Sequence, residues 1–193
     1  MSTGKRTEEY AIHVTTRTTN RKKGAILVTP YDIIQAWNAA HTDIPARFFV
    51  GVAQHETNFA TNEIDTEPNG FVSEGIYQIS RAEAREVGQS AADLLALGAA
   101  TKVAARLMER RLATIVQAAN LARPYPDDTW AYLGMSHNLG IGATLKTIRL
   151  HGLDWEAYKK RNPKLRIVSS GYGDDVISGG PHCPVPWRQW WAV

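Results

Sequence analysis

The chain has 193 residues, of which 44% are hydrophobic and 21% charged, and its formal net charge is +3. This length fits one domain that can bury a core without disulfides or metals, and the single cysteine, Cys183, excludes an intramolecular disulfide. No apolar run approaches the roughly 18 residues of a membrane span, and residues 1–23 lack the apolar core of a signal peptide.

Residues 1–24 are polar and basic, and we expect them to form an arm in front of one domain that covers residues 25–193. A basic arm can contact nucleic acid, anionic lipid or an anionic cell wall, but it is more often simply solvated. We therefore expect no nucleic-acid partner.

Helical patterns follow from residue 25 onward. Thr29-Pro30 supplies an N-cap and a first-turn proline, with Asp32 placed to complete a capping box. A second helix is expected from about Pro45 to Asn58. The turn-forming residues in 60–74 predict a loop or small hairpin.

The second half of the chain also reads as helical. Ser80 with Glu83 forms a second capping box, and a long Ala/Leu-rich helix is expected from Ser90 to about Ala122, with a break at Gly98. Further helices are expected after a cap at Asp127 or Asp128, from the end of the segment 140–142 to His151, and over residues 154–160. The predicted fold class is all-α, with a small β element possible at 60–74.

Glu56 is the candidate catalytic residue of the sequence. It closes an apolar helical stretch, next to Phe49, Val52 and Phe59. A helix C-terminus carries partial negative charge and apolar neighbours remove water, and both effects favour a protonated carboxyl near neutral pH. Such a carboxyl can give its proton to a leaving-group oxygen, as cleavage of a glycosidic bond requires.

Four segments carry a resemblance to a known family. His55-Glu56-Thr57-Asn58-Phe59 resembles the Glu-Ser-x-x-Phe motif of lytic transglycosylases and goose-type lysozymes, and residues 75–79 (Gly-Ile-Tyr-Gln-Ile) resemble their Gly-Leu-Met-Gln-Ile motif. Residues 137–142 (His-Asn-Leu-Gly-Ile-Gly) resemble their Tyr-Asn-x-Gly-x-Gly motif, and residues 171–177 resemble the late motif in which Val follows Tyr after four residues. The segments occur in the family's order.

The resemblance implies a lysozyme-like helical domain with a cleft for strands of N-acetylglucosamine and N-acetylmuramic acid, and no cofactor. It implies that Glu56 is the catalytic acid and that Gln78 binds a sugar amide or hydroxyl. Asn138 would hold backbone or substrate near Glu56, and Tyr172 would hydrogen-bond the Glu56 carboxyl.

Three positions depart from the family pattern. Thr57 replaces the usual Ser and keeps the hydroxyl. Tyr77 replaces Met and adds a stacking face or a phenol donor for substrate. His137 replaces Tyr, and a substrate contact is about as expected there as a packed imidazole.

A second carboxylate would decide between two reactions. Glycosidases that hydrolyse their substrate use two acids, one of which attacks the sugar or activates water. Asp65, Glu67 and Glu74 lie in the loop expected to face the cleft, and any of them could give a lysozyme. Without such an acid, the muramic acid 6-hydroxyl closes on the anomeric carbon, as in a lytic transglycosylase, which we slightly favour.

The sequence leaves several alternatives. The same fold could cleave chitin, or the chain could be a non-catalytic wall-binding or virion structural protein. A zinc-protease helix is excluded because Phe59 stands where the second histidine would be needed, and no other metal-ligand spacing is present. We expect a monomeric enzyme that acts on the bacterial cell wall, outside the cell, in the periplasm or on a virion, as a phage lysin would.

Overall fold

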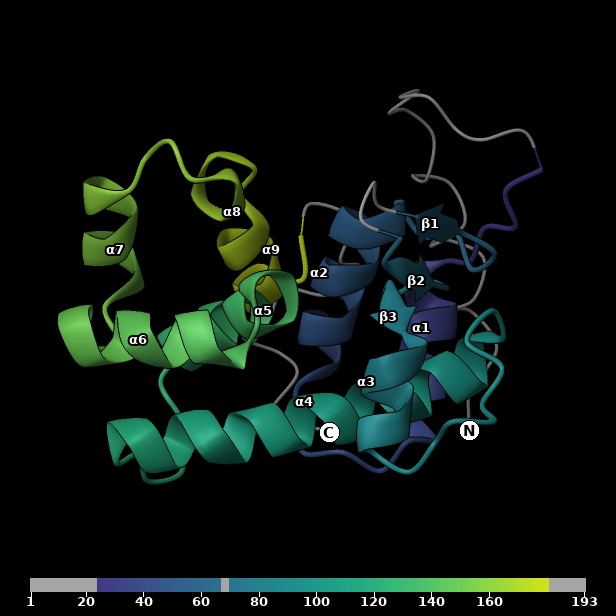
Figure 1. The fold of residues 1–193 in the computed structure, drawn as a ribbon, viewed down its shortest axis with the longest axis horizontal. Helices are drawn as coiled ribbons and strands as arrows, with labels where there is room; N and C mark the ends of the chain where they lie inside the picture. Colours follow the sequence, from purple (N-terminus) through teal and green to yellow (C-terminus); the bar gives the residue numbers. More distant parts are fainter. Residues whose placement is uncertain (1–23, 67–69, 181–193) are drawn as a thin grey trace, which may run out of the picture.

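The computed structural model describes residues 24–66 and 70–180, and the basic arm over residues 1–23 lies outside them. In the described residues the fold is mainly helical, with one small antiparallel sheet (Figure 1). The helices are α1 (Pro30–Asn38), α2 (Ala46–Thr57), α3 (Arg81–Glu86), α4 (Leu97–Ala119), α5 (Asp128–Leu139), α6 (Ile141–His151), α7 (Trp155–Arg161), α8 (Arg166–Ser169) and α9 (Tyr172–Ser178). The strands are β1 (Ile64–Thr66), β2 (Val72–Glu74) and β3 (Ile79–Ser80). The predicted class, all-α with a small β element, is confirmed.

The two capping boxes form as the sequence predicts. Thr29 accepts a hydrogen bond from the Asp32 backbone N–H, and the Asp32 carboxylate accepts one from the backbone N–H of Thr29. Ser80 and Glu83 exchange the same pair of bonds at the start of α3. These signals act within four residues, so no tertiary contact is needed to form them.

The long helix differs from its prediction. It begins at Leu97 instead of Ser90, and Gly98 lies in its first turn without breaking it. Before it, Asp93 accepts a hydrogen bond from the Leu95 backbone N–H, and Arg81 donates to the carbonyl of Ala92. These bonds give the backbone an alternative to the helix, which delays its start.

The cap predicted for α5 is also different. Asp127 stands at the N-cap but makes no capping bond with its side chain, because its carboxylate accepts from Arg47, 2.7 Å away. Asp128 accepts from the backbone N–H of Trp155. Both acids therefore tie α5 to other parts of the fold instead of satisfying its first turn.

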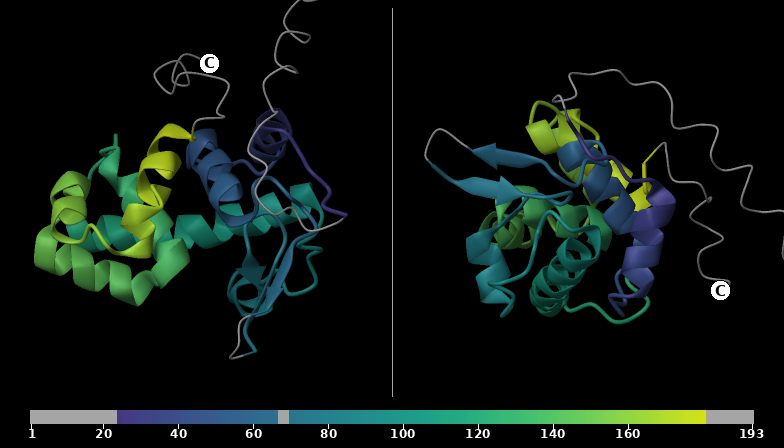
Figure 2. Two further views of the ribbon diagram at one scale, coloured as in Figure 1. Left: turned by 90° about the horizontal axis from the view of Figure 1, so that it is seen from above. Right: turned by 90° about the vertical axis from the view of Figure 1, so that its right-hand side faces the viewer.

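The sheet extends the hairpin predicted for residues 60–74. β1 pairs with β2, placing Asp65 opposite Ser73, and β2 pairs with β3, which was not predicted. In both views of Figure 2 the β1–β2 hairpin projects away from the helices. The sheet therefore meets the helical body mainly through the turn after β2 and through β3.

The core lies between the helices. α4 runs beneath the others and packs against α1, α5 and α6, while α9 packs against both α2 and α5 (Figure 1). One continuous cluster of buried side chains joins Ile33 of α1 to Val176 of α9. In the part of the chain that the structure describes, no helix is both long and apolar enough to cross a bilayer.

Candidate active site

Glu56 lies in the last turn of α2, and its side chain is 19% exposed. The helix ends one residue later because Asn58 adopts the left-handed conformation, with a φ of 50°. Phe59 also has a positive φ, 69°, and is buried. A bulky residue in this region is uncommon and costs about 1–3 kcal/mol, so the packing around Phe59 must compensate for it.

Tyr172 holds one oxygen of the Glu56 carboxyl. Its hydroxyl donates to Glu56 Oε1 at 2.9 Å, across 116 residues of sequence. Burial and the neighbouring Glu56 charge raise the pKa of Tyr172 well above its ordinary value, so the phenol keeps the proton that it donates. The contact implied by the family resemblance is present.

The close approach of α9 to α2 makes this contact possible. A Cβ atom at Gly51 would lie 2.4 Å from the backbone oxygen of Asp175, so a side chain there would separate the helices. One turn further along α2, His55 Nε2 lies 2.5 Å from the side-chain oxygen Oδ2 of the same residue, Asp175. The His55 ring lies 4.9 Å from the Tyr172 ring, between centroids.

His137 approaches the same oxygen from α5. Its Nε2 lies 2.8 Å from the backbone oxygen of Tyr77 and 3.7 Å from Glu56 Oε1. A carbonyl only accepts, so Nε2 carries a hydrogen and donates it to the Tyr77 carbonyl, while the Glu56 oxygen lies beyond hydrogen-bond distance. His137 is 4% exposed, which places it behind the acid and not on the surface.

A second ion pair stands behind His137. Glu83 binds Arg111 at 2.6 Å, and Arg111 also donates to the backbone oxygen of Ser136. Burial would raise the pKa of Glu83, but hydrogen bonds from Ser80 and the charges of His137 and Arg111 bring the pKa below its ordinary value. Glu83 therefore remains ionised beside His137.

The turn after β2 completes the surroundings of Glu56. The Thr57 hydroxyl donates to the backbone oxygen of Ile76 at 3.2 Å. Gly75 has a φ of 74°, and a Cβ there would lie 1.8 Å from the backbone oxygen of Leu94. Only glycine fits this turn, and its packing fixes the carbonyl of Tyr77 that receives His137.

The four segments that resemble the family motifs thus meet around one carboxyl. Thr57 binds the second segment through Ile76, His137 of the third binds the second through Tyr77, and Tyr172 of the fourth binds Glu56. They come from the end of α2, the turn after β2, the end of α5 and the start of α9. This convergence is a tertiary feature that no single segment specifies.

A scan against protein-family models, a search of curated proteins and a search of solved structures each return no match to this chain.

Tyr77 lies differently from the prediction, whereas Asn138 keeps the exposure that a substrate contact needs. Tyr77 is a core residue, 1% exposed, with its ring edge-to-face against Phe49 and its hydroxyl 3.1 Å from the Thr101 hydroxyl. Its ring is therefore unavailable for stacking on a sugar, and its contribution to the site is its backbone carbonyl. Asn138 is exposed at the end of α5, so it does not brace the buried backbone.

Gln78 uses its amide within the protein. Its Oε1 accepts from the Ser73 hydroxyl at 2.9 Å, and its Nε2 donates to the Gly75 backbone oxygen at 2.8 Å. These bonds brace the turn and join it to β2. The predicted sugar contact would have to share an amide that already has protein partners.

The three candidate second carboxylates have different surroundings. Arg81 binds both oxygens of Glu74, at 2.8 and 2.6 Å, so Glu74 is held in an ion pair. Asp65 is exposed in β1 and accepts from the backbone N–H of Thr66. Glu67 lies outside the described residues. Within those described, no group of three or more His, Cys, Asp or Glu side chains could hold a metal ion.

His55 and Asp175 were not predicted as site residues. Asp175 lies three residues after Tyr172, which puts both on one face of a helix. That signal could have been used only if residues 172–178 had been predicted as helical, and Gly173 followed by two aspartates does not favour a helix.

Proposed function

We propose that this chain is a peptidoglycan-cleaving glycosidase with a lysozyme-like helical domain, in which Glu56 is the general acid and base. The observation that carries the proposal is the meeting of four separate segments around Glu56, where the Tyr172 hydroxyl donates to its carboxyl and the His137 imidazole lies 3.7 Å from the same oxygen. A solvated surface glutamate would not need a buried phenol as the donor to its carboxyl.

The arrangement suggests which oxygen carries the reacting proton. Tyr172 and His137 both face Oε1, at 2.9 and 3.7 Å. Oε2 is then the atom that presents a proton to the bridging oxygen between N-acetylmuramic acid and N-acetylglucosamine. As that proton transfers, the glycosidic bond breaks and the leaving sugar departs as an alcohol.

The second half of the reaction favours a lytic transglycosylase over a lysozyme. The substrate's acetamido group stabilises the cationic centre, and the carboxylate of Glu56 takes the proton of the 6-hydroxyl as its oxygen bonds to the anomeric carbon. This route needs no second protein acid. The ion pair of Glu74 with Arg81 supports it, because a carboxylate held by two hydrogen bonds is a poor base for water.

The decisive experiment compares Glu56→Gln with Glu86→Gln, a matched change at an exposed position of α3. We expect Glu56→Gln to slow turbidity loss of a peptidoglycan suspension by at least ~100-fold, the usual worth of general acid catalysis, while sedimentation with the wall persists. Glu86→Gln should behave as the wild type. Equal activity in Glu56→Gln and wild type would instead support a non-catalytic wall-binding or virion structural protein.

Mass spectrometry of the products separates the remaining possibilities. Muropeptides with an anhydro end indicate transglycosylation, and reducing muropeptides indicate hydrolysis. Release of chito-oligomers from chitin, with no products from peptidoglycan, would identify chitin as the substrate. In this function the protein acts on the bacterial cell wall as a monomer, and its binding partner is the glycan strand. Analytical ultracentrifugation with and without soluble glycan strands would test the oligomeric state and the binding.

A further inference from the structure

The segment that forms α6, α7 and α8 is strongly basic. Residues 141–169 contain seven Lys or Arg and only two acids, Asp154 and Glu156. The whole chain has 22 basic and 19 acidic residues, so this excess is local and is not a property of the composition.

Both acids of the segment are already engaged. Asp154 caps α7 by accepting from the backbone N–H of Ala157 at 2.7 Å. Glu156 binds Lys159 at 2.7 Å, and Asp174 of α9 binds the same ammonium at 2.7 Å. Within the segment, Glu156 therefore offsets the charge of Lys159, and Asp154 is engaged in the cap of α7.

Five cations form what we call the basic edge: Lys146, Arg149, Lys160, Arg161 and Lys164. All five are exposed. Arg161 donates to Nδ1 of His151 at 3.0 Å, which joins the ends of α7 and α6. An acceptor nitrogen on His151 belongs to a neutral ring, so this bond orients the guanidinium without cancelling its charge.

Stabilisation of helix ends accounts for only part of this charge. Arg149, Lys160 and Arg161 lie in the last turns of their helices, where cations offset the partial negative charge of the carbonyls. Lys146 lies before the last turn of α6, and Lys164 lies beyond the end of α7. A helix-end explanation therefore does not include them.

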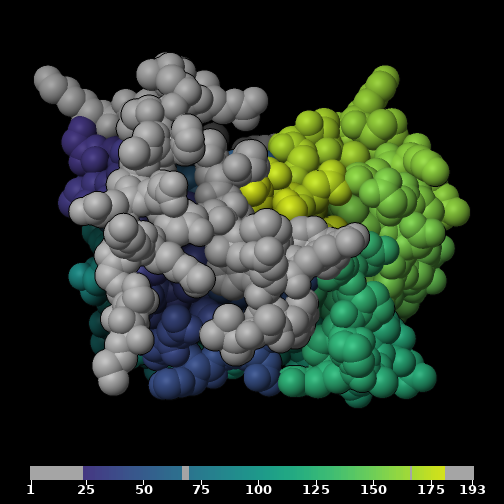
Figure 3. Space-filling model, turned by 180° about the vertical axis from the view of Figure 1, so that it is seen from behind, coloured from purple at the N-terminus to yellow at the C-terminus, as the bar shows by residue number. Residues whose placement is uncertain are grey.

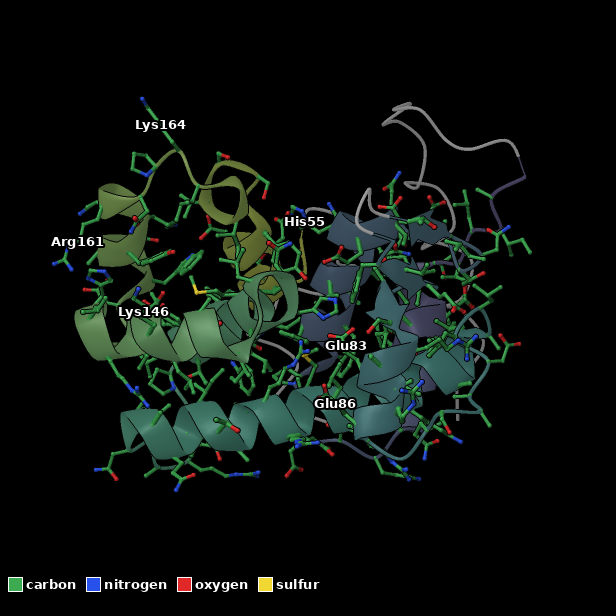
Figure 4. All side chains as sticks on the ribbon, viewed as in Figure 1. His55, Glu83, Glu86, Lys146, Arg161 and Lys164 are labelled. Atoms are coloured by element: carbon green, nitrogen blue, oxygen red, sulfur yellow. The ribbon has the colours of Figure 1, made fainter. Side chains whose placement is uncertain are left out.

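The basic edge is remote from the candidate site. Lys146, Arg161 and Lys164 lie at one end of the molecule, whereas His55, in the last turn of α2, lies near the middle (Figure 4). From behind, the α6–α8 lobe and α9 form one continuous surface (Figure 3). A long polymer could therefore contact the edge while another strand occupied the site.

We propose that the basic edge binds a phosphodiester-bearing anionic polymer of the cell wall and so holds the enzyme on its substrate. This role rests on the proposed function, but the binding itself does not require cleavage. Exposed Lys and Arg bind phosphodiesters by charge, with affinity that falls as salt rises. The aromatic residues of the segment, Trp155 and Tyr158, are buried, so it lacks the stacking surface that single-stranded nucleic acid uses.

The test uses two full-length variants with equal loss of charge, each in a Glu56→Gln background so that no cleavage occurs. The first carries Lys146→Gln, Arg149→Gln, Lys160→Gln and Lys164→Gln. The control carries Arg85→Gln, Lys102→Gln, Arg106→Gln and Arg110→Gln, at exposed positions of α3 and α4. Binding is measured to immobilised poly(glycerol phosphate), to peptidoglycan stripped of phosphate polymers with hydrofluoric acid, and to duplex DNA.

We expect the first variant to bind poly(glycerol phosphate) at least ~10-fold more weakly than its parent, with a shallower salt dependence, and the control to change less than ~3-fold. Binding to stripped peptidoglycan should be equal in all three proteins. Equal losses in the variant and the control would overturn the proposal, as would tighter binding of the parent to duplex DNA than to the phosphate polymer. Failure of the wild type to cleave stripped peptidoglycan would contradict the proposed catalytic function but not the proposed binding by the basic edge.

Discussion

The two sides of the candidate site are built differently. On the helical side, α2, α5 and α9 meet through a glycine contact and through buried side chains far apart in sequence, such as Tyr172 and Glu56. On the other side, β1 is exposed throughout, and the sheet is formed by neighbouring segments of the chain. The acid thus depends on long-range packing, whereas the hairpin depends on local bonds that tolerate change. The following predictions test that contrast.

The largest effect is expected at Gly51. A methyl group at this position would lie 2.4 Å from the backbone oxygen of Asp175, and backbone cannot rotate away as a side chain can. We expect Gly51→Ala to lower the free energy of unfolding by about 3 kcal/mol, the upper range for overpacking, and to abolish activity by moving Tyr172. Chemical denaturation and turbidity assays measure the two effects.

Gly98→Ala is the matched control for Gly51→Ala. A Cβ at Gly98 meets open space, and alanine favours a helix over glycine. Stability should be unchanged or slightly raised, with full activity. A Gly51→Ala protein as stable as the wild type would show that α2 and α9 can move apart at little cost, and that the helical side of the site does not depend on this close packing.

The ion pair behind His137 should have the second largest effect. Glu83→Gln leaves Arg111, which is 12% exposed, without its anionic partner. We expect a loss of about 2 kcal/mol at pH 7, less than the 3–5 kcal/mol of a fully buried pair. Chemical denaturation at pH 7 measures this loss.

The effect of Glu83→Gln should depend on pH. Because the pKa of Glu83 is lowered in the fold, its stabilisation is complete above the unfolded pKa of about 4.3 and disappears as the pH falls through the folded pKa. Melting temperatures of variant and wild type should therefore begin to converge as the pH falls below the unfolded pKa of about 4.3. A constant difference from pH 7 to pH 3 would contradict the role of the ionised carboxylate.

Tyr172→Phe should affect activity more than stability. It removes the hydrogen bond to Glu56 Oε1 and keeps the buried ring. We expect about 1–2 kcal/mol of destabilisation, as for a hydrogen bond to a charged group, and a ~10–100-fold fall in kcat. Tyr158→Phe, at another buried tyrosine, is the control and should leave kcat unchanged. A similar kcat in both variants would mean that the Tyr172 hydroxyl has no part in the reaction.

The smallest effect is expected in the sheet. Arg81→Gln breaks the ion pair with Glu74 and the hydrogen bond to the Ala92 carbonyl, but Arg81 is 45% exposed, so water can replace both partners. Such pairs contribute about 0–1 kcal/mol, so the melting temperature should change little. If a free Glu74 served as the second acid, the variant would gain reducing muropeptides among its products, which mass spectrometry would detect.

The features that could be predicted from the sequence are those set by residues close together in the chain, and the features that could not are set by tertiary contacts. The capping boxes at Thr29 and Ser80 could be predicted because a cap is set within four residues. The start of α4 could not, because Arg81 binds the carbonyl of Ala92 through the tertiary structure. The burial of the Tyr77 side chain could not be predicted either, because it depends on the contacts of the turn after β2 with Phe49 and Thr101.

The bond between Tyr172 and Glu56 also bears on biosynthesis. α2 can emerge from the ribosome and fold long before α9 has been translated, because 116 residues separate the two partners. During that interval the carboxylate lacks the phenol that orients it. A nascent chain that stops before α9 therefore carries Glu56 without the Tyr172 hydroxyl. The surroundings of Glu56 cannot be complete before α9 has been translated.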